Sequence, residues 1–314
     1  TVRSGLQGPR SRHGGSGAAS DGPMRPAPCE DRCRSEEPVR QWLSALQWGA
    51  ARRAWELMVG ANPLPACMGR ICYAPCESGC VLATRRMDGG AVGIKGLEAA
   101  VGELALHDGW ALGEPGAPTG KRVAVVGSGP CGLSAAHQLV LAGHEVVLLE
   151  AHHALGGMLR RGISERRLPR WILDGEISRL VDGRMEVALS SPVRRIERAM
   201  EGRDGMIWAA GASTCMAVVE GATIWRQPIH MDRSDRRTAT VSIGRGARAA
   251  RALSDYLIGE SRAADIAGGP RGSGPDSVGA GSVLPPNTRM MADEVGMAGR
   301  CILCGSRGAL QHPR

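Results

Sequence analysis

The 314-residue sequence has no phenylalanine and only two tyrosines, two lysines and two asparagines, and aromatic residues make up 3% of it. Nucleic acids are bound by a basic face, and single strands also by aromatic side chains on which bases stack. Aromatic residues are too few for such stacking, and the arginines behind the net charge of +8 are scattered along the chain. We therefore expect no nucleic-acid partner. The positive charge suits an acidic redox partner or an anionic cofactor.

The first 28 residues lack any apolar run and are rich in Gly, Ser, Arg and Pro. This composition predicts a disordered N-terminus rather than a signal peptide or a membrane anchor. We expect a cytoplasmic protein with no membrane partner. Ten cysteines in such a chain favour metal ligation or reduced thiols over a disulfide framework.

Between residues 29 and 112 the apolar side chains recur at helical spacing, which predicts a small helical domain. We expect a helix pair over residues 38–60, broken at Gly49, and another helix over residues 94–107. The segment GEPGAPTG at 113–120 has the Gly and Pro content of an interdomain linker. A second domain is therefore expected to begin near residue 118.

Residues 118–260 alternate between predicted strands and helices, a pattern typical of βαβ folds. The expected elements are a strand at 123–126, a helix at 133–141 and strands at 146–149 and 206–210. Beyond them, residues 261–314 begin with a Gly-, Ser- and Pro-rich stretch and end with a C-x-x-C pair, Cys301 and Cys304. We expect a flexible tail there.

Gly127, Gly129 and Gly132 form a G-x-G-x-x-G turn between the first predicted strand and its helix. In dinucleotide-binding domains the first glycine permits the tight turn, the second admits the pyrophosphate, and the third lets helix and strand pack closely. Glu150 ends the second predicted strand, where a carboxylate accepts hydrogen bonds from ribose hydroxyls. The order of strand, turn, helix, strand and acid predicts dinucleotide binding; the alternative is a tight structural turn.

The cysteines of the helical region are closely spaced: four, three and three residues separate Cys67, Cys72, Cys76 and Cys80, with Cys29 and Cys33 upstream. Thiolates at such spacing hold iron–sulfur clusters, whereas structural zinc favours C-x-x-C pairs set well apart. Spacing alone favours iron–sulfur and leaves a zinc-binding interaction module as an alternative.

Two stretches of the sequence resemble one known family. The segment from Gly127 to Pro169, GSGPCGLSAAHQLVLAGHEVVLLEAHHALGGMLRRGISERRLP, resembles the flavin-binding half of the small subunit of NADPH-dependent glutamate synthase and the matching part of dihydropyrimidine dehydrogenase. The segment NPLPACMGRICYAPCESGC is similar to the cluster-binding helical domain of the same family. The resemblance implies an α/β protein in which a small α-helical iron–sulfur domain precedes a Rossmann-like FAD-binding domain.

The resemblance also implies which residues bind the cofactors. FAD would lie along Gly127, Gly129, Pro130, Gly132, Glu150, Gly156, Gly157, Met158, Leu159, Arg167 and Asp232. One [4Fe-4S] cluster would take Cys33, Cys72, Cys76 and Glu98. A second would use Cys29 and Cys80, and would need Cys301 and Cys304 to complete it. Cys67, Cys131 and Cys215 match no ligand position and are expected to be inert.

Family members insert an NADPH-binding domain within the FAD domain, and here that insertion is missing near residues 214–229. One competing feature is G-x-G-x-x-A at Gly244, Gly246 and Ala249, either a nicotinamide-binding turn or, as in the family, the start of the helix that closes the flavin site. We favour the helix, and thus no direct use of NADPH.

The expected function is an FAD- and iron–sulfur-dependent oxidoreductase or electron-transfer subunit. It would act with a redox partner or a larger catalytic subunit. The sequence identifies no catalytic acid, base or nucleophile. The alternative is a shortened, non-catalytic relative that binds FAD or a cluster only structurally.

Overall fold

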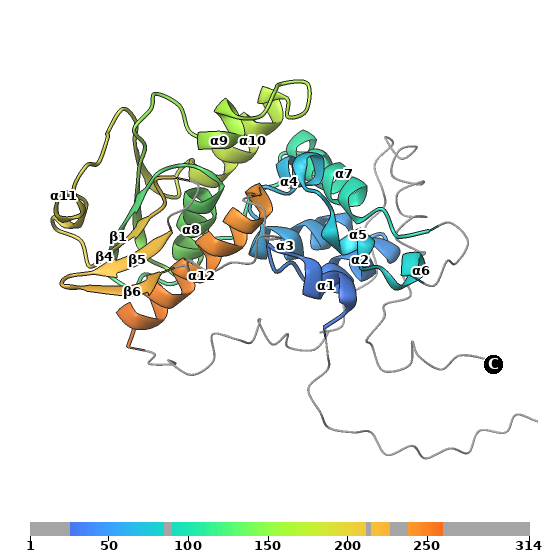
Figure 1. Cartoon of the computed structure of the whole chain (residues 1–314), viewed down its shortest axis with the longest axis horizontal. Helices are drawn as coiled ribbons and strands as arrows, with labels where there is room; N and C mark the ends of the chain where they lie inside the picture. The colour runs from blue at the N-terminus through green and yellow to red at the C-terminus, as the bar shows by residue number, and fades with distance from the viewer. Residues whose placement is uncertain (1–25, 85–89, 212–214, 227–237, 260–314) are drawn as a thin grey trace, which may run out of the picture.

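The computed structural model describes residues 26–84, 90–211, 215–226 and 238–259. A group of helices lies beside an α/β unit built around one twisted sheet (Figure 1). The helical domain consists of α1 (Pro28–Arg32), α2 (Val39–Gln47), α3 (Ala51–Ala61), α4 (Pro65–Ile71), α5 (Pro75–Ser78), α6 (Val81–Thr84) and α7 (Ile94–His107).

Helices α2 and α3 form the predicted helix pair, and Gly49 between them adopts a positive φ of 74°. This left-handed conformation favours glycine and ends the first helix. Because the chain has no phenylalanine, tryptophan supplies the large aromatic side chains of this core. Trp42 and Trp55 are fully buried, and the rings of Trp55 and Trp110 pack edge to face with their centroids 5.8 Å apart. The scarcity of other aromatics is offset by these large side chains.

Helices α4 and α7 cross so closely that each presents a glycine to an alanine of the other. A Cβ on Gly69 would lie 2.3 Å from the backbone nitrogen of Ala99, and one on Gly102 would lie 2.4 Å from that of Ala66. No side chain fits at either position. The close crossing fixes α4, which ends just before Cys72, against α7, which carries Glu98.

The second domain is Rossmann-like and begins with the strand after the linker. Its elements are β1 (Arg122–Val126), α8 (Pro130–Leu141), β2 (Glu145–Leu149), α9 (Gly157–Arg161), α10 (Arg170–Val181), β3 (Glu186–Ala188), α11 (Ile196–Met200), β4 (Gly205–Trp208), β5 (Met216–Val219), β6 (Ala222–Arg226) and α12 (Ala239–Leu257).

The sheet has the order β3-β2-β1-β4-β5-β6. Strands β3, β2, β1 and β4 are parallel, and β4, β5 and β6 are antiparallel neighbours. The central strand β1 is buried from Val123 to Val126, as expected for a parallel strand covered on both faces. The predicted fold class, a helical domain followed by an α/β Rossmann-like domain, is confirmed.

Within the described residues, the chain between β4 and α12 forms the β5–β6 hairpin and no second parallel sheet. The G-x-G-x-x-A stretch lies inside α12, as favoured above, where its glycines serve helix packing. A Cβ on Gly246 would lie 2.0 Å from the Cys131 carbonyl oxygen, and one on Gly244 would lie 2.1 Å from that of Arg34. None of the helices in the described part is long and apolar enough to span a bilayer.

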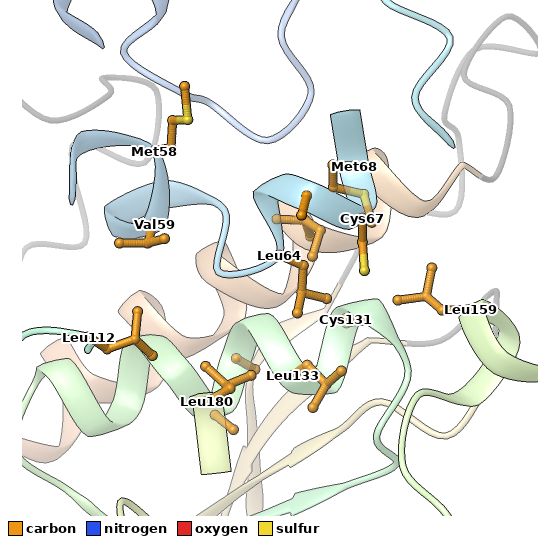
Figure 2. Packing of buried hydrophobic residues seen from close by; sticks show 14 of the residues in the cluster. Met58, Val59, Leu64, Cys67, Met68, Leu112, Cys131, Leu133, Leu159 and Leu180 are labelled. Atoms are coloured by element: carbon orange, nitrogen blue, oxygen red, sulfur yellow. The ribbon is translucent and has the colours of Figure 1, made fainter. Parts of the chain in front are cut away.

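The two domains share a continuous apolar core. Leu64, Cys67 and Met68 of the helical domain face Leu133, Leu159 and Leu180 of the Rossmann-like domain (Figure 2). Polar contacts reinforce this interface: His137 Nε2 lies 2.8 Å from the Val59 carbonyl oxygen, and Gln138 donates to that of Gly60 at 2.8 Å. The helical domain is therefore held in a fixed position beside the G-x-G-x-x-G turn.

Candidate functional site

The three glycines of the turn have the roles that their spacing predicts. Gly127 has a φ of 98°, and a Cβ there would lie 2.8 Å from the Ala209 carbonyl oxygen. A Cβ on Gly132 would lie 1.8 Å from the Gly127 carbonyl oxygen. At Gly129, by contrast, a Cβ would meet nothing within 4 Å. The open space lies at the start of α8, where backbone N–H groups and the helix dipole favour a phosphate.

Glu150 lies at the end of β2, beside the turn, and is buried. One carboxylate oxygen accepts hydrogen bonds from the backbone N–H (2.9 Å) and the hydroxyl of Ser128, and the other accepts one from His152 N–H at 2.9 Å. Although burial alone would raise its pKa, these hydrogen bonds lower it, so the carboxylate stays ionised. The oxygen bonded to His152 keeps capacity for a ribose hydroxyl.

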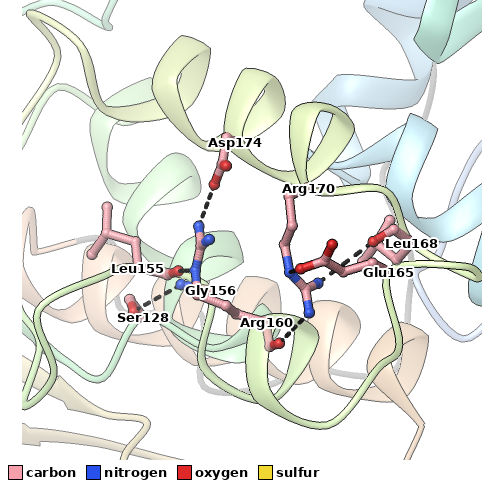
Figure 3. Close-up of polar contacts among 8 residues, drawn as sticks. All are labelled: Ser128, Leu155, Gly156, Arg160, Glu165, Leu168, Arg170 and Asp174. Atoms are coloured by element: carbon pink, nitrogen blue, oxygen red, sulfur yellow. Dashed lines mark hydrogen bonds and ion pairs between the residues drawn. The ribbon is translucent and has the colours of Figure 1, made fainter.

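Gly156 and Gly157 bring the next segment over the turn. Both have positive φ, 112° and 50°, and a Cβ on Gly157 would lie 2.7 Å from the Gly129 Cα. The Gly156 N–H donates to the Ser128 carbonyl at 3.1 Å and lies 3.2 Å from its hydroxyl oxygen (Figure 3). Only glycine permits this backbone conformation and approach.

Two arginines hold the segment that follows. Arg160 donates to the Leu155 carbonyl at 2.6 Å and pairs with Asp174 of α10. Arg170 donates to the Arg160 carbonyl at 2.7 Å and pairs with Glu165 at 3.3 Å (Figure 3). Residues 156–170 are thereby fixed to α10 as a rigid wall beside the turn.

The remaining predicted flavin residues fall into different places. Pro130 is the first residue of α8. On α9, Met158 is 58% exposed and available to a ligand, whereas Leu159 is fully buried in the interdomain core. Arg167 reaches the helical domain, donating to the Ile71 carbonyl at 3.0 Å and lying 5.8 Å from the Tyr73 ring centroid. Asp232 lies outside the described residues.

The predicted ligands of the first cluster come together in the helical domain. Burial raises the pKa of Cys76, and the neighbouring thiols of Cys33 and Cys72 and the carboxyl of Glu98 raise it further. Burial, with the nearby Glu37 and Glu98, raises the pKa of Cys33 to about 12. These three thiols and one carboxyl therefore lie within electrostatic reach of one another. Burying ionisable groups costs free energy, and a metal that binds their anionic forms offsets this cost.

Glu98 is anchored by a buried polar network that the sequence did not reveal. Asn62 Nδ2 donates to Glu98 at 2.8 Å and to Glu37 at 3.0 Å, while Asn62 Oδ1 accepts from Leu64 N–H at 3.1 Å. Ser35 donates to Glu37 at 2.9 Å, and its hydroxyl oxygen lies 3.2 Å from Cys33 Sγ. Burial and the neighbouring Glu37 raise the pKa of Glu98 well above its usual range. Asn62 thus holds two buried carboxyl groups beside the thiols.

Among the described residues, no three His, Cys, Asp or Glu side chains converge tightly enough for a single metal ion. A four-iron cluster binds each thiolate through a different iron, so its ligands stand further apart than those of one ion. The donor set of Cys33, Cys72, Cys76 and Glu98 suits such a cluster in the chemical kind and the number of its ligands.

The second predicted ligand set is only partly described. Cys29, in α1, and Cys80, between α5 and α6, are both buried. Their segments pack closely, since a Cβ on Gly79 would lie 3.0 Å from the Pro28 carbonyl oxygen. Cys301 and Cys304 lie outside the described residues. Cys67, which matched no ligand position, is fully buried in the interdomain core (Figure 2).

Glu176 is a further residue that sequence reasoning missed. It is buried in α10, and its carboxylate accepts the backbone N–H groups of Ala66 (2.8 Å) and Cys67 (2.9 Å) in the first turn of α4. The Rossmann-like domain therefore directly orients the helix that leads to Cys72. A buried acid in an otherwise amphipathic helix is the only sequence signal for it.

Comparisons with known families agree with this geometry. Residues 24–110 match the family model described as dihydropyrimidine dehydrogenase domain II, 4Fe-4S cluster, and residues 125–181 match that described as an NAD(P)-binding Rossmann-like domain. The first match covers the helical domain with its cysteines, and the second covers the glycine-rich turn through α10.

Individual relatives match the same regions. The NADPH glutamate synthase small chain of Mycobacterium tuberculosis (strain H37Rv) is 37% identical over 48% of this chain and 31% of its own length. That of Bacillus subtilis is 37% identical over 45% of this chain and 28% of its own length. The NAD-dependent dihydropyrimidine dehydrogenase subunit PreT of Escherichia coli K12 is 32% identical over 49% of this chain and 37% of its own. The matched part thus spans about a third of these relatives.

The fold and the family matches define the class of protein: a chain with a helical domain of the 4Fe-4S type followed by a Rossmann-like dinucleotide-binding domain. Its relatives are the glutamate synthase small chains and the related dihydropyrimidine dehydrogenase subunits. The family resemblance found in the sequence is thereby confirmed over about half of the chain.

Proposed function

We propose that this chain is an electron-transfer subunit in which the glycine-rich turn binds FAD and the helical domain binds a [4Fe-4S] cluster. The observation that carries the proposal is the hydrogen-bonded interface between the two sites: Glu176 and Arg167 of the Rossmann-like domain form hydrogen bonds with the backbone of α4. Bound flavin and cluster would supply the redox chemistry. The chain's own residues would position both groups and exclude water between them.

Each site has residues suited to its group. The space beyond Gly129 and the ionised carboxylate of Glu150 suit a pyrophosphate and a ribose. The set of Cys33, Cys72, Cys76 and Glu98 would hold one cluster, and Cys29 with Cys80, Cys301 and Cys304 would hold a second. The described hairpin between β4 and α12 supports the proposal that NADPH does not reduce the chain directly. The electrons would then be exchanged with a larger catalytic subunit in the cytoplasm.

The test is anaerobic purification, followed by measurement of released flavin and of iron per chain. The Gly129→Val variant should lose flavin and keep its fold, because the φ of −69° at Gly129 suits valine and a Cβ there meets nothing within 4 Å. Gly113→Val is the matched control, since its Cβ also meets nothing within 4 Å but lies in the linker.

Three outcomes would change the proposal. A wild-type chain that neither releases nor takes up flavin would exclude the FAD site. Flavin and iron that are present, but are not reduced by a strong chemical reductant or reoxidised by an artificial acceptor, would favour the alternative of a non-catalytic relative. Zinc in place of iron would favour the interaction module.

A further inference from the structure

Two cysteines with no assigned role contact each other beneath the dinucleotide turn. Cys131, in the first turn of α8, and Cys215, just before β5, place their Sγ atoms 3.0 Å apart, although 84 residues separate them in sequence. Both thiols are free and buried. A disulfide needs a sulfur–sulfur distance of about 2.05 Å. The sulfurs would thus have to approach by only about 1 Å.

Both cysteines are held in place by α12. The close approach of Gly246 to the Cys131 carbonyl fixes the first turn of α8 against this helix. Cys215 Sγ lies 3.9 Å from the carbonyl oxygen of Arg245, the residue before Gly246. The thiols are therefore brought together by packing against α12.

We propose that Cys131 and Cys215 are a redox-active dithiol that hydrogen peroxide converts into a disulfide at the base of the dinucleotide turn. In the first step one sulfur attacks peroxide, the O–O bond breaks, and a sulfenic acid and water form. In the second step the other sulfur attacks the sulfenic sulfur, an S–S bond forms, and the departing hydroxide takes the remaining thiol proton as water. Two thiols and one peroxide thus give one disulfide and two waters.

Cys131 is the residue that meets the oxidant first. It is 9% exposed, against 2% for Cys215, and it lies in the first turn of a helix. Its hydrogen bond with Cys215, together with burial, raises its pKa, so the first step is slow at neutral pH. The second step is fast by comparison, because the partner sulfur is already in contact.

The disulfide would link the dinucleotide turn covalently to the strand pair at the sheet edge. Cys131 lies between Pro130 and Gly132 of the turn, so a shift of its sulfur would alter the backbone that faces the cofactor. A change in dinucleotide affinity after oxidation is an expectation that rests on the proposed function. The formation of the disulfide itself does not, since it needs no cofactor.

The test is peptide mapping of the full-length, anaerobically purified chain after treatment with hydrogen peroxide in native buffer at mildly alkaline pH. Remaining thiols are blocked with N-ethylmaleimide in acid before digestion with trypsin. The tryptic peptides 123–160 and 204–226 each contain a single cysteine, Cys131 and Cys215. We expect one cross-linked species of these two peptides, about 2 Da lighter than their sum, that disappears on reduction.

Variants separate the dithiol from general cysteine oxidation. In Cys215→Ala the peptide with Cys131 should gain oxygen atoms instead of a cross-link, whereas Cys67→Ala, which removes another buried thiol, should leave the cross-link intact. Wild-type peptides that remain separate after treatment, either unmodified or with oxygen added to each, would overturn the proposal. The cross-link without any bound flavin would support it and count against the proposed FAD site alone.

Discussion

Glu176 in the Rossmann-like domain accepts a 2.9 Å hydrogen bond from the backbone N–H of Cys67 in the helical domain. A second buried titratable group, His137, crosses the same interface to the Val59 carbonyl at 2.8 Å. Burial raises the pKa of Glu176 to about 7 and lowers the pKa of His137 to about 4. The interface that joins the two sites therefore contains an acid and a base whose neutral forms are favoured.

These two groups oppose each other in the dependence of stability on pH. As pH rises from 4.5 to 7 the unfolded chain loses the Glu176 proton first, so the free energy of unfolding falls. As pH falls from 6.5 to 4 the unfolded chain gains the His137 proton first, so the free energy of unfolding again falls. Each effect is about 3 kcal/mol, and in the wild type they offset each other between pH 4.5 and 6.5.

We predict that Glu176→Gln exposes the histidine effect. Relative to the wild type, the free energy of urea unfolding of this variant should rise by about 3 kcal/mol between pH 4.5 and 7, because the variant lacks the Glu176 effect. The amide replaces a carboxyl that accepts two backbone N–H groups, so a uniform loss of about 1–2 kcal/mol should accompany it. Glu186→Gln, an exposed position on β3, is the control and should keep the wild-type profile.

The converse holds for His137→Gln. Relative to the wild type, its free energy of unfolding should fall by about 3 kcal/mol as pH rises from 4 to 6.5, because the variant lacks the His137 effect. His153→Gln, at an exposed position, should leave the profile unchanged. If the two interface variants had parallel pH profiles, the assignment of one buried acid and one buried base would be wrong.

Local pattern was enough to predict much of the fold. The helix over residues 94–107 and the break at Gly49 follow from apolar spacing and from glycine, and both are found. The first cluster set was predicted from the motif and the family positions and stays a prediction; Cys72 directly follows α4, and Cys76 lies within α5. These features depend on residues close in sequence or on a quoted motif.

The contacts that the sequence did not reveal join distant segments. Glu176 reaches Ala66 across 110 positions, Asn62 reaches Glu98 across 36, and Cys131 reaches Cys215 across 84. No local periodicity encodes such pairs, since they arise only when two domains or two ends of a sheet pack together. Asp232, Cys301 and Cys304 remain predictions.

We predict that Asn62→Leu weakens the first cluster site. The substitution removes the single donor shared by two buried carboxyl groups, which should cost about 3 kcal/mol of stability and release Glu98 from its fixed orientation. The amount of iron bound per chain should fall, and the electron paramagnetic resonance spectrum of the remaining cluster should change. Gln138→Leu, which removes one exposed side-chain hydrogen bond to Gly60, is the control. If Asn62→Leu kept the iron content and the spectrum of the wild type, the cluster would not depend on the orientation that Asn62 gives to Glu98.

The last prediction concerns the tail and the number of clusters. The first site has a candidate for every ligand position, whereas the second has only Cys29 and Cys80 among the described residues, and two thiolates rarely retain a four-iron cluster. We predict that Cys301 and Cys304 complete it; the 41 residues from 260 to 300 are long enough, since an extended chain of that length spans up to about 130 Å.

Deletion of residues 290–314, or the double change Cys301→Ser and Cys304→Ser, should therefore lower iron from about eight to about four atoms per chain. Cys76→Ser is the matched comparison, because it should remove the other four and leave the second site loaded. Full-length protein that holds about four irons, with no change on deletion, would exclude the tail as a ligand source and leave a one-cluster protein. Iron that falls to zero on deletion would instead show that both sites depend on the tail, contrary to the complete ligand set of Cys33, Cys72, Cys76 and Glu98.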